Sequence, residues 1–469
     1  MGLIYFVGIG GIGMSAIAEI LHDLGYKVSG SDQSDGANVA RLRAKGIAVH
    51  VGHQEDNIHD IDTLVISTAI KPDNPEYRRA RELNIPIAHR ADMLATLMRL
   101  KKSIAIGGTH GKTTTTSLIA HMLITAGLDP SVISGGILNN YQSNAKLGQG
   151  EWLVAEADES DGSFLLLPAA VKVVTNIDAE HLDHYGNFDK VKESFLQFMR
   201  AGPIDGFVVA CRDHPLVSTL IDSIDDRRVI SYGVNESSPN SMVAAQHITF
   251  NQAGAHFDIA YHQAGERRVE KNITLPMLGI HNVSNATAAI AVGLEMGIRW
   301  EAIRLALQTF QGVKRRFSLV GVANGQRARN IRVIDDYAHH PTEITAVLAA
   351  AKTAVASKGR LMVIMQPHRY TRLRDLFDDF CQSLQPCHSL WVADVYAAGE
   401  AAIAGIDADH FIAAIKQQGH PRVDKVIAAD QLAAQLAPAL KTDDMVLCLG
   451  AGDISKWAGR LAQELEPRL

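Results

Sequence analysis

Residues 107–116, GGTHGKTTTT, constrain the fold of this chain more than any other stretch. They follow an apolar run, SIAI, and precede an amphipathic segment, SLIAHML. Glycines at positions 107, 108 and 111 let the backbone turn tightly, so that its N–H groups can surround an anion at the start of a helix. The stretch therefore predicts a strand, a phosphate-binding loop and a helix in succession. The alternative, a chance Gly-Lys-Thr at a helix start, has to account for the strand and the helix as well.

Two residues of this loop suit a nucleoside triphosphate. Lys112 supplies a positive charge for β- and γ-phosphates, and the Thr113 hydroxyl is an oxygen ligand for Mg²⁺. Three residues separate Gly107 from Gly111, whereas the standard P-loop has four in the corresponding place. We therefore predict a shortened P-loop that binds nucleotide phosphates.

A second glycine-rich stretch, VGIGGIGMSAIAEIL at residues 7–21, has the spacing of a dinucleotide-binding fingerprint at Gly8, Gly10 and Gly13. It follows the strand-like LIYFV and precedes YKVSGSD, which ends in Asp32, a carboxylate placed to hold a ribose hydroxyl. The pattern predicts a Rossmann-like βαβ unit. Its ligand stays open at this point, because NAD and any other nucleotide diphosphate offer the same charges, and a turn without ligand is the remaining interpretation.

The two loops together disfavour NAD. A dehydrogenase has no need of a second loop that carries a lysine. An enzyme that cleaves ATP to activate a substrate carried on a nucleotide needs two phosphate sites.

The pattern of strands divides the chain into three blocks, residues 1–100, 101–314 and 315–469, each of which alternates apolar strands with helical stretches. Such alternation is typical of parallel sheets. We predict an α/β fold of three domains: an N-terminal Rossmann-like domain, a central P-loop ATPase-like domain with a β-rich excursion near 231–275, and a C-terminal Rossmann-like domain. The strands expected in the third block are IRVIDDYA, RLMVIMQ, SLWVADVY, KVIAAD and DMVLCLG.

Charge and composition exclude several classes of partner. The 469 residues carry a net charge of -6 without acidic or basic blocks, which argues against a nucleic-acid partner. No apolar run is long enough to span a bilayer and no signal segment begins the chain, so we expect a cytoplasmic protein without a membrane partner. The four cysteines show no CxxC pairing or zinc spacing, in keeping with reduced thiols. Nothing in the sequence decides the oligomeric state.

Polar clusters follow several predicted strands, where open α/β sheets bind ligands. WLVAEADESDGSF carries Glu156, Asp158, Glu159 and Asp161, hard oxygen ligands for Mg²⁺, although caps or exposed acids are the alternative for each. TNIDAEHLDHYG carries His181, which is either a ligand or a structural histidine. Amide, cationic and imidazole groups occur in the same way in LGIHNVSNATAA, FQGVKRRF, IDDYAHHPTE and QPHRYTRLRDL. Helix capping or a solvated turn is the alternative interpretation for these groups.

Seven segments, taken in order, resemble the Mur ligases, the ATP-dependent amide-forming enzymes that build the peptide of bacterial cell-wall precursors. They are GTHGKTTT, EADESD, TNIDAEHLDHY, GIHNVSNA, RRF, DDYAHHPTE and QPHRYTR. The resemblance covers essentially the whole chain. Within the family, the N-terminal GIGGIGMSAIAEIL together with EADESDGSF, DYAHHPTE and QPHRYTRLRDL is similar to members that add L-alanine to UDP-N-acetylmuramate and hold its UDP in the first domain.

The resemblance implies a reaction, its cofactors and its substrates. The lactyl carboxylate of UDP-N-acetylmuramate would be joined to the amine of L-alanine through an acyl phosphate, with ATP and Mg²⁺, in the synthesis of peptidoglycan precursors. The first fingerprint would then hold a UDP-sugar and not NAD. Because ligands come from three domains, we also expect an open form without ATP and a closed form with it.

The resemblance also implies a role for each matching residue. The expected catalytic residues are Lys112, Glu159, His181 and Arg316. The expected ATP contacts are Gly108, Thr109, His110, Gly111, Lys112, Thr113, Thr114, Asn282, Arg316 and Asp336. The expected metal ligands are Thr113, Glu159 and His181. The expected UDP-sugar contacts are Gly8, Gly10, Gly11, Gly13, Asp32 and Ser67. The expected residues on the muramoyl and amino-acid side are His339, His340, His368, Arg369 and Arg372.

Three alternatives remain at this stage. A close relative in the family joins a recycled tripeptide to the same UDP-sugar. An NAD-dependent oxidoreductase accounts for the N-terminus but leaves residues 107–116 without a purpose. A non-catalytic module would bind ATP without turnover, against which the carboxylates after the strand argue weakly.

Overall fold

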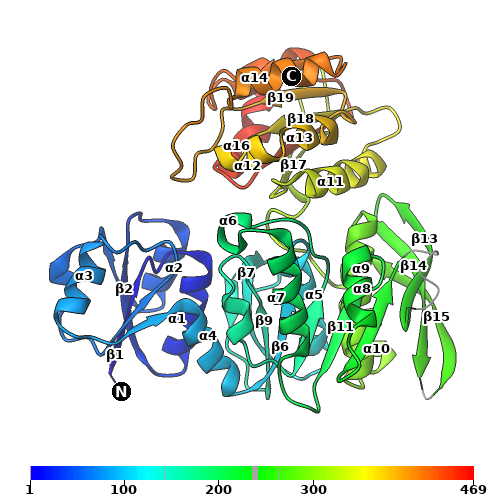
Figure 1. The fold of residues 1–469 in the computed structure, drawn as a ribbon. Coiled ribbons are helices and arrows are strands. Elements are labelled where there is room, and N and C mark those ends of the chain that lie inside the picture. The colour runs from blue at the N-terminus through cyan, green and yellow to red at the C-terminus, as the bar shows by residue number, and fades with distance from the viewer. Residues whose placement is uncertain (1, 142, 235–240, 264) are drawn as a thin grey trace. The chain divides into compact units, whose positions relative to one another are not determined.

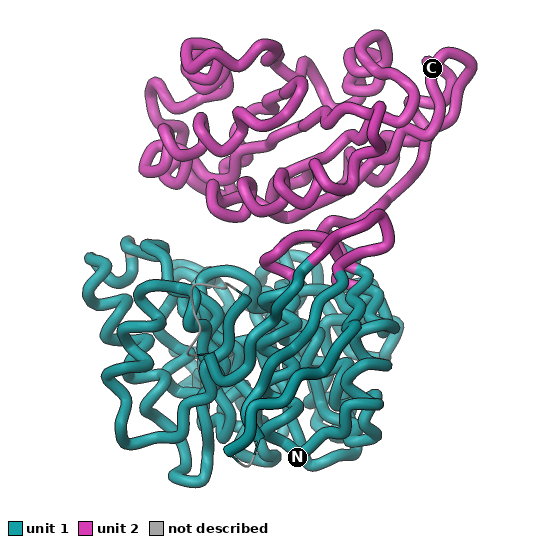
Figure 2. The backbone as a smooth tube through the Cα atoms, turned by 90° about the vertical axis from the view of Figure 1, so that its right-hand side faces the viewer, with its two compact units in different colours: residues 1–248, 256–276, 283–311 teal, residues 249–255, 277–282, 312–469 magenta. Residues whose placement is uncertain are grey.

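The computed structural model describes residues 2–141, 143–234, 241–263 and 265–469. Three sheets with flanking helices make up the fold, as predicted (Figure 1). The chain separates into two compact units: residues 1–248, 256–276 and 283–311 form the first, and residues 249–255, 277–282 and 312–469 form the second (Figure 2). The predicted domain boundaries near residues 100 and 314 stay predictions.

The first sheet is parallel with the strand order β3-β2-β1-β4-β5. The chain reverses direction across the sheet at β1, and ligands of open α/β sheets bind at such a switch point. Its strands are β1 (Leu3–Val7), β2 (Lys27–Asp32), β3 (Ala48–Val51), β4 (Thr63–Ile66) and β5 (Ile87–His89). Its helices are α1 (Ile12–Asp23), α2 (Ala37–Ala44), η1 (Glu55–Asn57), α3 (Pro75–Glu82) and α4 (Arg90–Arg99).

The second sheet has ten strands in the order β15-β14-β13-β12-β11-β10-β6-β9-β7-β8. Strand β6 lies between β10 and β9 and is parallel to both, so the loop that follows β6 opens at an edge shared by three strand ends. The strands are β6 (Lys102–Gly107), β7 (Ser131–Leu138), β8 (Ser143–Lys146), β9 (Trp152–Glu156), β10 (Val171–Val174), β11 (Phe207–Cys211), β12 (Arg228–Gly233), β13 (Val243–Asn251), β14 (Gly254–Gln263) and β15 (Glu266–Leu275).

The helices of this region include α5, which begins at the predicted phosphate loop. They are α5 (Lys112–Thr125), η2 (Ser163–Leu166), α6 (Leu182–Tyr185), α7 (Phe188–Arg200), α8 (Pro215–Asp222), α9 (Ile280–Glu295) and α10 (Trp300–Gln308). Strands β13, β14 and β15 form the β-rich excursion predicted near 231–275.

The third sheet has the order β16-β17-β21-β18-β19-β20, in which only the edge strand β16 runs antiparallel to its neighbour. The strands are β16 (Ser318–Ala323), β17 (Ile331–Asp336), β18 (Leu361–Met365), β19 (Ser389–Val392), β20 (Val423–Lys425) and β21 (Met445–Leu449). The helices are α11 (Pro341–Ala354), α12 (Tyr370–Asp375), α13 (Phe377–Ser383), α14 (Ala408–Gln417), α15 (Leu432–Leu436), η3 (Ala437–Ala439), α16 (Ile454–Leu465) and η4 (Glu466–Arg468).

One predicted strand of this region is misplaced. KVIAAD was expected to form a strand, but the strand there is Val423–Lys425, and only its last residue belongs to that segment. A short apolar run does not reveal by periodicity which of its residues pair with a neighbouring strand.

A continuous hydrophobic core joins the first two sheets. One cluster of buried residues includes Phe6 and Ile17 of the first region and Ile133 and Phe198 of the second. Helix α1 packs against β7 and β8 as well as against its own sheet. The third sheet has its own cores on its two faces. Burial of apolar surface therefore joins the first two predicted domains into one unit.

No helix within the described ranges is long and apolar enough to cross a membrane.

Candidate active site

The second glycine loop, residues 107–112, has a backbone that a larger residue could not adopt at two positions. Gly108 has φ +128°, and a Cβ there would lie 2.1 Å from Thr175 Oγ1. Gly111, the N-cap of α5, has φ +83°, and a Cβ there would lie 2.6 Å from Asn285 Oδ1. Glycine accepts such positive φ values at little cost. The loop is therefore closely confined by the residue after β10 and by a residue of α9.

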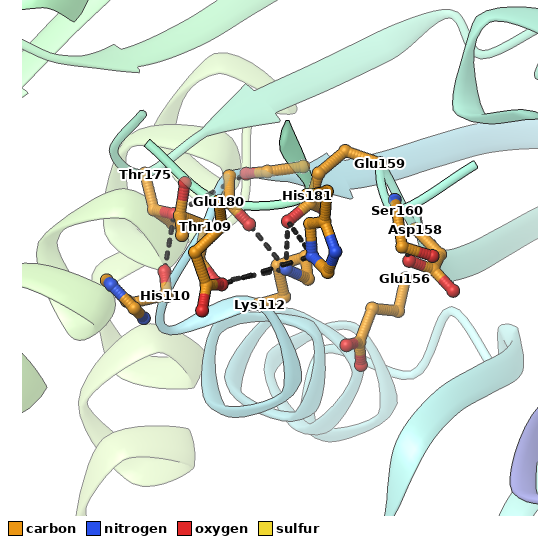
Figure 3. Close-up of polar contacts among 12 residues, drawn as sticks. Thr109, His110, Lys112, Glu156, Asp158, Glu159, Ser160, Thr175, Glu180 and His181 are labelled. Atoms are coloured by element: carbon orange, nitrogen blue, oxygen red, sulfur yellow. Dashed lines mark hydrogen bonds and ion pairs between the residues drawn. The ribbon is translucent and has the colours of Figure 1, made fainter. Parts of the chain in front are cut away.

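Lys112 is held at the centre of this loop by three acceptors (Figure 3). Its Nζ donates to Gly108 O at 2.6 Å, to Thr109 O at 3.0 Å and to Glu159 Oε1 at 2.9 Å. Burial acts to lower the pKa of Lys112, but the negative charges of Glu159 and Glu156 outweigh it, so the pKa is raised. The side chain is therefore a fixed cation inside a loop of backbone groups.

Glu159 is the buried partner of this lysine. It is 2% exposed, and burial, together with the charge of Asp158, raises its pKa to about 7 against the opposing effect of Lys112. Its Oε2 is buried and has no hydrogen-bond partner among the described residues. Tyr185 donates to the Glu159 backbone oxygen at 2.6 Å. His181 Nε2 lies 3.9 Å from Glu159 Oε1, so two of the predicted metal ligands lie side by side (Figure 3).

A second carboxylate lies at the start of α5. Thr113 Oγ1 is 3.0 Å from Glu156 Oε2, and Gly135 N donates to the same oxygen at 2.8 Å. Glu156 ends β9, and because β9 is parallel to β6 the two strand ends meet at one edge of the sheet. The sequence indicated Glu156 only as one of four candidate carboxylates, and the structure places it beside Thr113.

Within the described ranges, no three His, Cys, Asp or Glu side chains come together as a ready metal site. Glu159 instead pairs with Lys112, and Glu156 accepts a hydrogen bond from Thr113.

The remaining predicted residues of this loop are held by Asn176 and Asp178, for which the sequence predicted no role. Asn176 accepts from His110 N at 2.7 Å and donates to His110 O at 3.0 Å. Asp178 lies 3.1 Å from His110 Nε2, and its backbone N donates to Thr109 Oγ1 at 2.8 Å. Hydrogen bonds from His110 and His214 lower the pKa of Asp178. Both missed residues lie in TNIDAEHLDHYG, where polar side chains directly after a strand were the available signal. Thr114 is buried in the first turn of α5.

The first glycine loop, residues 8–13, is closed by hydrogen bonds to β2. Gly8 N and Ile9 N both donate to Ser31 O, at 2.8 Å and 2.9 Å. Gly10 N donates to Asp32 Oδ2 at 2.9 Å. The predicted loop and the predicted carboxylate therefore meet, with one carboxylate oxygen on the loop itself.

The other residues predicted to bind the UDP-sugar gather at the same edge of the first sheet. Gly11 is the N-cap of α1, and Gly13 lies in the first turn of that helix. Ser67 directly follows β4, which pairs with β1. The contacts of these residues with a UDP-sugar stay predictions.

In the second unit, Arg316 and Asp336 lie in a tight cluster of their own. Asp336 is 3% exposed and accepts from Phe317 N and Ala338 N, each at 2.7 Å. Burial raises the pKa of Asp336 to about 6, against the effects of Arg316 and the two backbone hydrogen bonds. Arg316 Nη1 is 3.7 Å from Glu343 Oε1. Asp336 thus fixes the backbone at Ala338, just after β17, and at Phe317, next to Arg316. Its predicted contact with ATP stays a prediction.

Three of the residues predicted for the muramoyl and amino-acid side are neighbours. The rings of His339 and His368 have centroids 5.8 Å apart, and Arg372 Nη1 lies 3.2 Å from His368 Nδ1. Burial, with the charges of His339, Arg372 and Arg369, lowers the pKa of His368 to about 3. His368 also stacks on Tyr396 with the ring planes 11° apart. A neutral imidazole beside a cation therefore lines the carboxyl edge of the third sheet.

The two other predicted residues on that side differ in burial. His340 is buried, and its Nδ1 accepts from Thr342 N at 3.3 Å as the N-cap of α11. Arg369 is exposed and has φ +69°, a left-handed conformation that is uncommon outside glycine. Residues held in such sparsely populated backbone conformations cluster at functional sites, where the direction of the side chain is constrained.

The two asparagines at the start of α9 have different surroundings. Asn282 Nδ2 donates to Leu278 O at 2.8 Å. Asn285 Oδ1 accepts from Thr115 Oγ1 at 3.2 Å and lies against Gly111. The family resemblance implies an ATP contact for Asn282, whereas Asn285 is the asparagine that lies against the second glycine loop. The adenine contact of Asn282 stays a prediction.

Models of one protein family match the chain in the order of its three sheets. The Mur ligase family, catalytic domain, matches residues 3–102, the Mur ligase middle domain matches 106–293, and the Mur ligase, glutamate ligase domain, matches 315–452. This chain belongs to the Mur ligase family. The first glycine loop of this Mur ligase lies in the first match and the second glycine loop in the middle one. The family consists of ATP-dependent ligases, in keeping with the lysine-bearing loop.

Named relatives of this Mur ligase match it over nearly its full length. It is 53% identical over 468 residues to the UDP-N-acetylmuramate–L-alanine ligase of Bradyrhizobium sp. (strain ORS 278), covering 99% of this chain and 98% of that protein. It is 52% identical over 467 residues to the ligase of the same name from Brucella ovis, with the same 99% and 98% coverage.

Solved structures of two ligases have the same fold as this Mur ligase. The crystal structure of UDP-N-acetylmuramate-alanine ligase from Thermotoga maritima matches with a TM-score of 0.82 and 32% identity over 99% of both chains. A murein peptide ligase from Psychrobacter arcticus matches with a TM-score of 0.72 over 99% of both chains, at 22% identity, which shows the fold alone.

Proposed function

We propose that this chain is an ATP-dependent ligase that joins the lactyl carboxylate of UDP-N-acetylmuramate to the amine of L-alanine through an acyl phosphate. The observation that carries this proposal is Lys112, a fixed cation in a glycine loop, ion-paired with the buried Glu159. The relatives at 52% and 53% identity over nearly the whole chain support the choice of substrates. We place the reaction in the cytoplasm, in the synthesis of peptidoglycan precursors.

The arrangement around Lys112 suits the first half of this reaction. A carboxylate is a poor acyl donor, so the lactyl carboxylate attacks the γ-phosphate of ATP, which gives an acyl phosphate and ADP. Negative charge spreads over the phosphoryl oxygens in the transition state, and a preorganised cation stabilises it without reorganisation. Lys112 is already held in place by Gly108, Thr109 and Glu159, so it supplies that charge.

The second half of the reaction needs an amine and a leaving group. The deprotonated amine of L-alanine adds to the acyl carbon, and the tetrahedral intermediate collapses to the amide as inorganic phosphate leaves. We assign the alanine carboxylate to Arg369 and Arg372, since a guanidinium pairs well with a carboxylate. The neutral His368 lies beside Arg372 and adds no further positive charge to the two arginines.

Mg²⁺ fits the residues around Lys112. Glu159 Oε2 is a buried acceptor without a hydrogen-bond partner in the described part of the chain, and Thr113 Oγ1 and Glu156 provide further oxygens nearby. Mg²⁺ in phosphoryl-transfer sites is bound by one or two carboxylates together with substrate phosphates. We propose Thr113, Glu159 and His181 as ligands, with Glu156 as a fourth candidate. The ion would neutralise charge on the phosphoryl oxygens.

The first glycine loop is proposed to hold the UDP of the substrate. Gly8, Gly10, Gly11 and Gly13 bring the backbone close to the N-terminus of α1, where a diphosphate is favoured. Asp32 and Ser67 lie at the same edge of the sheet. For the second unit we propose that Arg316 contacts the ATP phosphates and that Asn282 and Asp336 contact the nucleoside.

Release of inorganic phosphate by the purified protein tests the proposal. We expect release with ATP, Mg²⁺, UDP-N-acetylmuramate and L-alanine together, and none when any one of the four is omitted. Release that persists without L-alanine would contradict the proposal. No release with L-alanine but release with the tripeptide L-alanyl-γ-D-glutamyl-meso-diaminopimelate would identify a tripeptide ligase instead, and NADH binding by fluorescence would identify a dehydrogenase.

A further inference from the structure

Arg90 lies between the two glycine loops and is absent from every role assigned so far. It is the first residue of α4, whose first turn is closed by a hydrogen bond from His89 N to Asp92 Oδ2 at 3.0 Å. A Cβ at Gly13 would lie 2.8 Å from Arg90 Nη1 and 3.3 Å from Arg90 Cδ. The side chain of Arg90 therefore packs against the first turn of α1, at the end of the first glycine loop, in a place left open by a glycine.

The other side of the guanidinium faces the acidic segment after β9. Arg90 Nη2 donates to Asp158 Oδ2 at 3.0 Å. Burial acts to raise the pKa of Asp158, but the charge of Arg90 and hydrogen bonds from Ser160 outweigh it and hold the pKa at about 2. Asp158 precedes Glu159, the partner of Lys112. One side chain thus connects the first loop with the segment that supplies the acid of the second.

Most of the hydrogen-bonding capacity of Arg90 is unused. A guanidinium has five N–H donors, and Asp158 is its only hydrogen-bond partner among the described residues. The side chain is 24% exposed, so a ligand can reach it. Helix α4 gains nothing from a cation in its first turn, because the macrodipole favours anions there. The internal hydrogen bonds of Arg90 and the stability of α4 therefore do not explain why an arginine occupies this position.

We propose that Arg90 binds the diphosphate of the UDP-sugar and that Asp158 holds its guanidinium ready for it. This inference rests on the proposed function. The first glycine loop offers a diphosphate only backbone N–H groups, and none of its own residues carries a positive charge. A guanidinium supplies that charge and pairs with two phosphate oxygens at once. The lactyl carboxylate is the other anion of the substrate, but it has to reach the γ-phosphate beside Lys112, whereas Arg90 lies on the first turn of α1.

Calorimetric titration of the full chain with UDP, with UDP-N-acetylmuramate and with Mg²⁺-ATP tests this role. In Arg90→Ala we expect the affinity for both uridine compounds to fall by the same factor, roughly ten- to a hundredfold, the range for hydrogen bonds to a charged group. The affinity for Mg²⁺-ATP is expected to change less than twofold. Arg90→Lys, which keeps the charge but loses the paired hydrogen bonds, is expected to lie between Arg90→Ala and the wild type.

Asp158→Asn distinguishes an Arg90 that binds the diphosphate from an Arg90–Asp158 ion pair that only fastens α4. If Arg90 binds the diphosphate and Asp158 positions it, Asp158→Asn keeps the guanidinium but loses its positioning, and the affinity for UDP falls by a smaller factor than in Arg90→Ala. If the ion pair only fastens α4 to the acidic segment, Asp158→Asn weakens UDP binding as much as Arg90→Ala does, and the proposal is wrong. Unchanged UDP affinity in Arg90→Ala also overturns it. A loss confined to UDP-N-acetylmuramate overturns the diphosphate assignment, because the contact is then with the lactyl carboxylate.

These outcomes are distinct from failure of the proposed function. Wild-type protein that binds neither UDP nor UDP-N-acetylmuramate, or that releases phosphate without L-alanine, refutes the proposed function. Wild-type protein that passes both tests, with Arg90→Ala binding UDP normally, refutes only the role of Arg90. A thermal melt of each variant confirms that the compared proteins are folded.

Discussion

The two glycine loops of the first unit share a backbone plan but differ in the origin of their polar groups. Each follows a parallel strand and precedes a helix, at the carboxyl edge of its sheet. The second loop carries its own cation, Lys112, paired with the buried Glu159. The first loop carries no charged residue. Its carbonyls at Gly10 and Ile12 are satisfied by Asn38 of α2 and Asn144 of β8.

The difference indicates a division of labour, in which the second loop acts in catalysis and the first loop in binding. A cation built into a glycine loop is fixed relative to the phosphate, which is what stabilisation of a transition state requires. A loop of neutral groups holds a diphosphate without acting on it, and its shape then depends on neighbours from other elements. The first loop belongs to the first sheet, yet Asn144 comes from the second, so the second sheet helps to shape the predicted UDP site.

The largest expected effect is at Lys112. Lys112→Met removes the built-in charge of the second loop, and we expect kcat for phosphate release to fall by about a thousandfold, near the upper range for loss of one preorganised group. The KM for UDP-N-acetylmuramate is expected to stay within about twofold, because the first loop is untouched. Lys102→Met is the matched control, since Lys102 starts the same strand and is 59% exposed. Equal loss in both variants would contradict the division of labour.

An intermediate effect is expected at Asn144, a fully buried residue. Its Nδ2 donates to Ile12 O and its Oδ1 accepts from Arg41 Nη2, both at 2.5 Å. Asn144→Ala removes both hydrogen bonds, and we expect the KM for UDP-N-acetylmuramate to rise about tenfold, with the KM for ATP unchanged, in steady-state kinetics. Lys146→Ala, which removes an ion pair with Asp129 at the end of the same strand, is the control. A rise in both KM values would show a general loss of structure instead.

The smallest effect on kcat and KM is expected at Lys172, on the strand next to β6, where the change concerns stability. Its ammonium donates to Phe198 O at 2.6 Å and Ala201 O at 2.8 Å, and burial, with a smaller contribution from Arg227, lowers its pKa to about 7. Between pH 7 and 10 the unfolded chain therefore binds more protons than the folded one. Stability relative to Lys172→Met should rise across this window, by at most about 1.4 kcal/mol per pH unit.

Chemical denaturation of the two proteins at pH 7, 8.5 and 10 measures that difference. A stability difference that is constant with pH would show that Lys172 keeps its proton throughout. In that case the lysine is a permanent cap on the last carbonyls of α7 and not a titrating group.

Much of the site could be predicted because its signals are local. Gly108 and Gly111 need positive φ values, and a glycine between a strand and a helix reports that need directly in the sequence. Lys112 and Glu159 belong to short motifs, and the structure places them 2.9 Å apart. Asn176, Asp178 and Arg90 were missed because each acts on a residue at least 66 positions away.

By itself, the sequence determined the order of strands and helices, the two glycine loops and the charged residues of the short motifs, Lys112 and Glu159, since these depend on spacing along the chain. The tertiary structure alone decided which distant groups meet. It placed Glu156 at Thr113, Asn144 at Ile12 and Arg90 at Gly13. Packing across a shared hydrophobic core creates such pairs, and the pattern of one segment contains no information about the partner that the core brings to it.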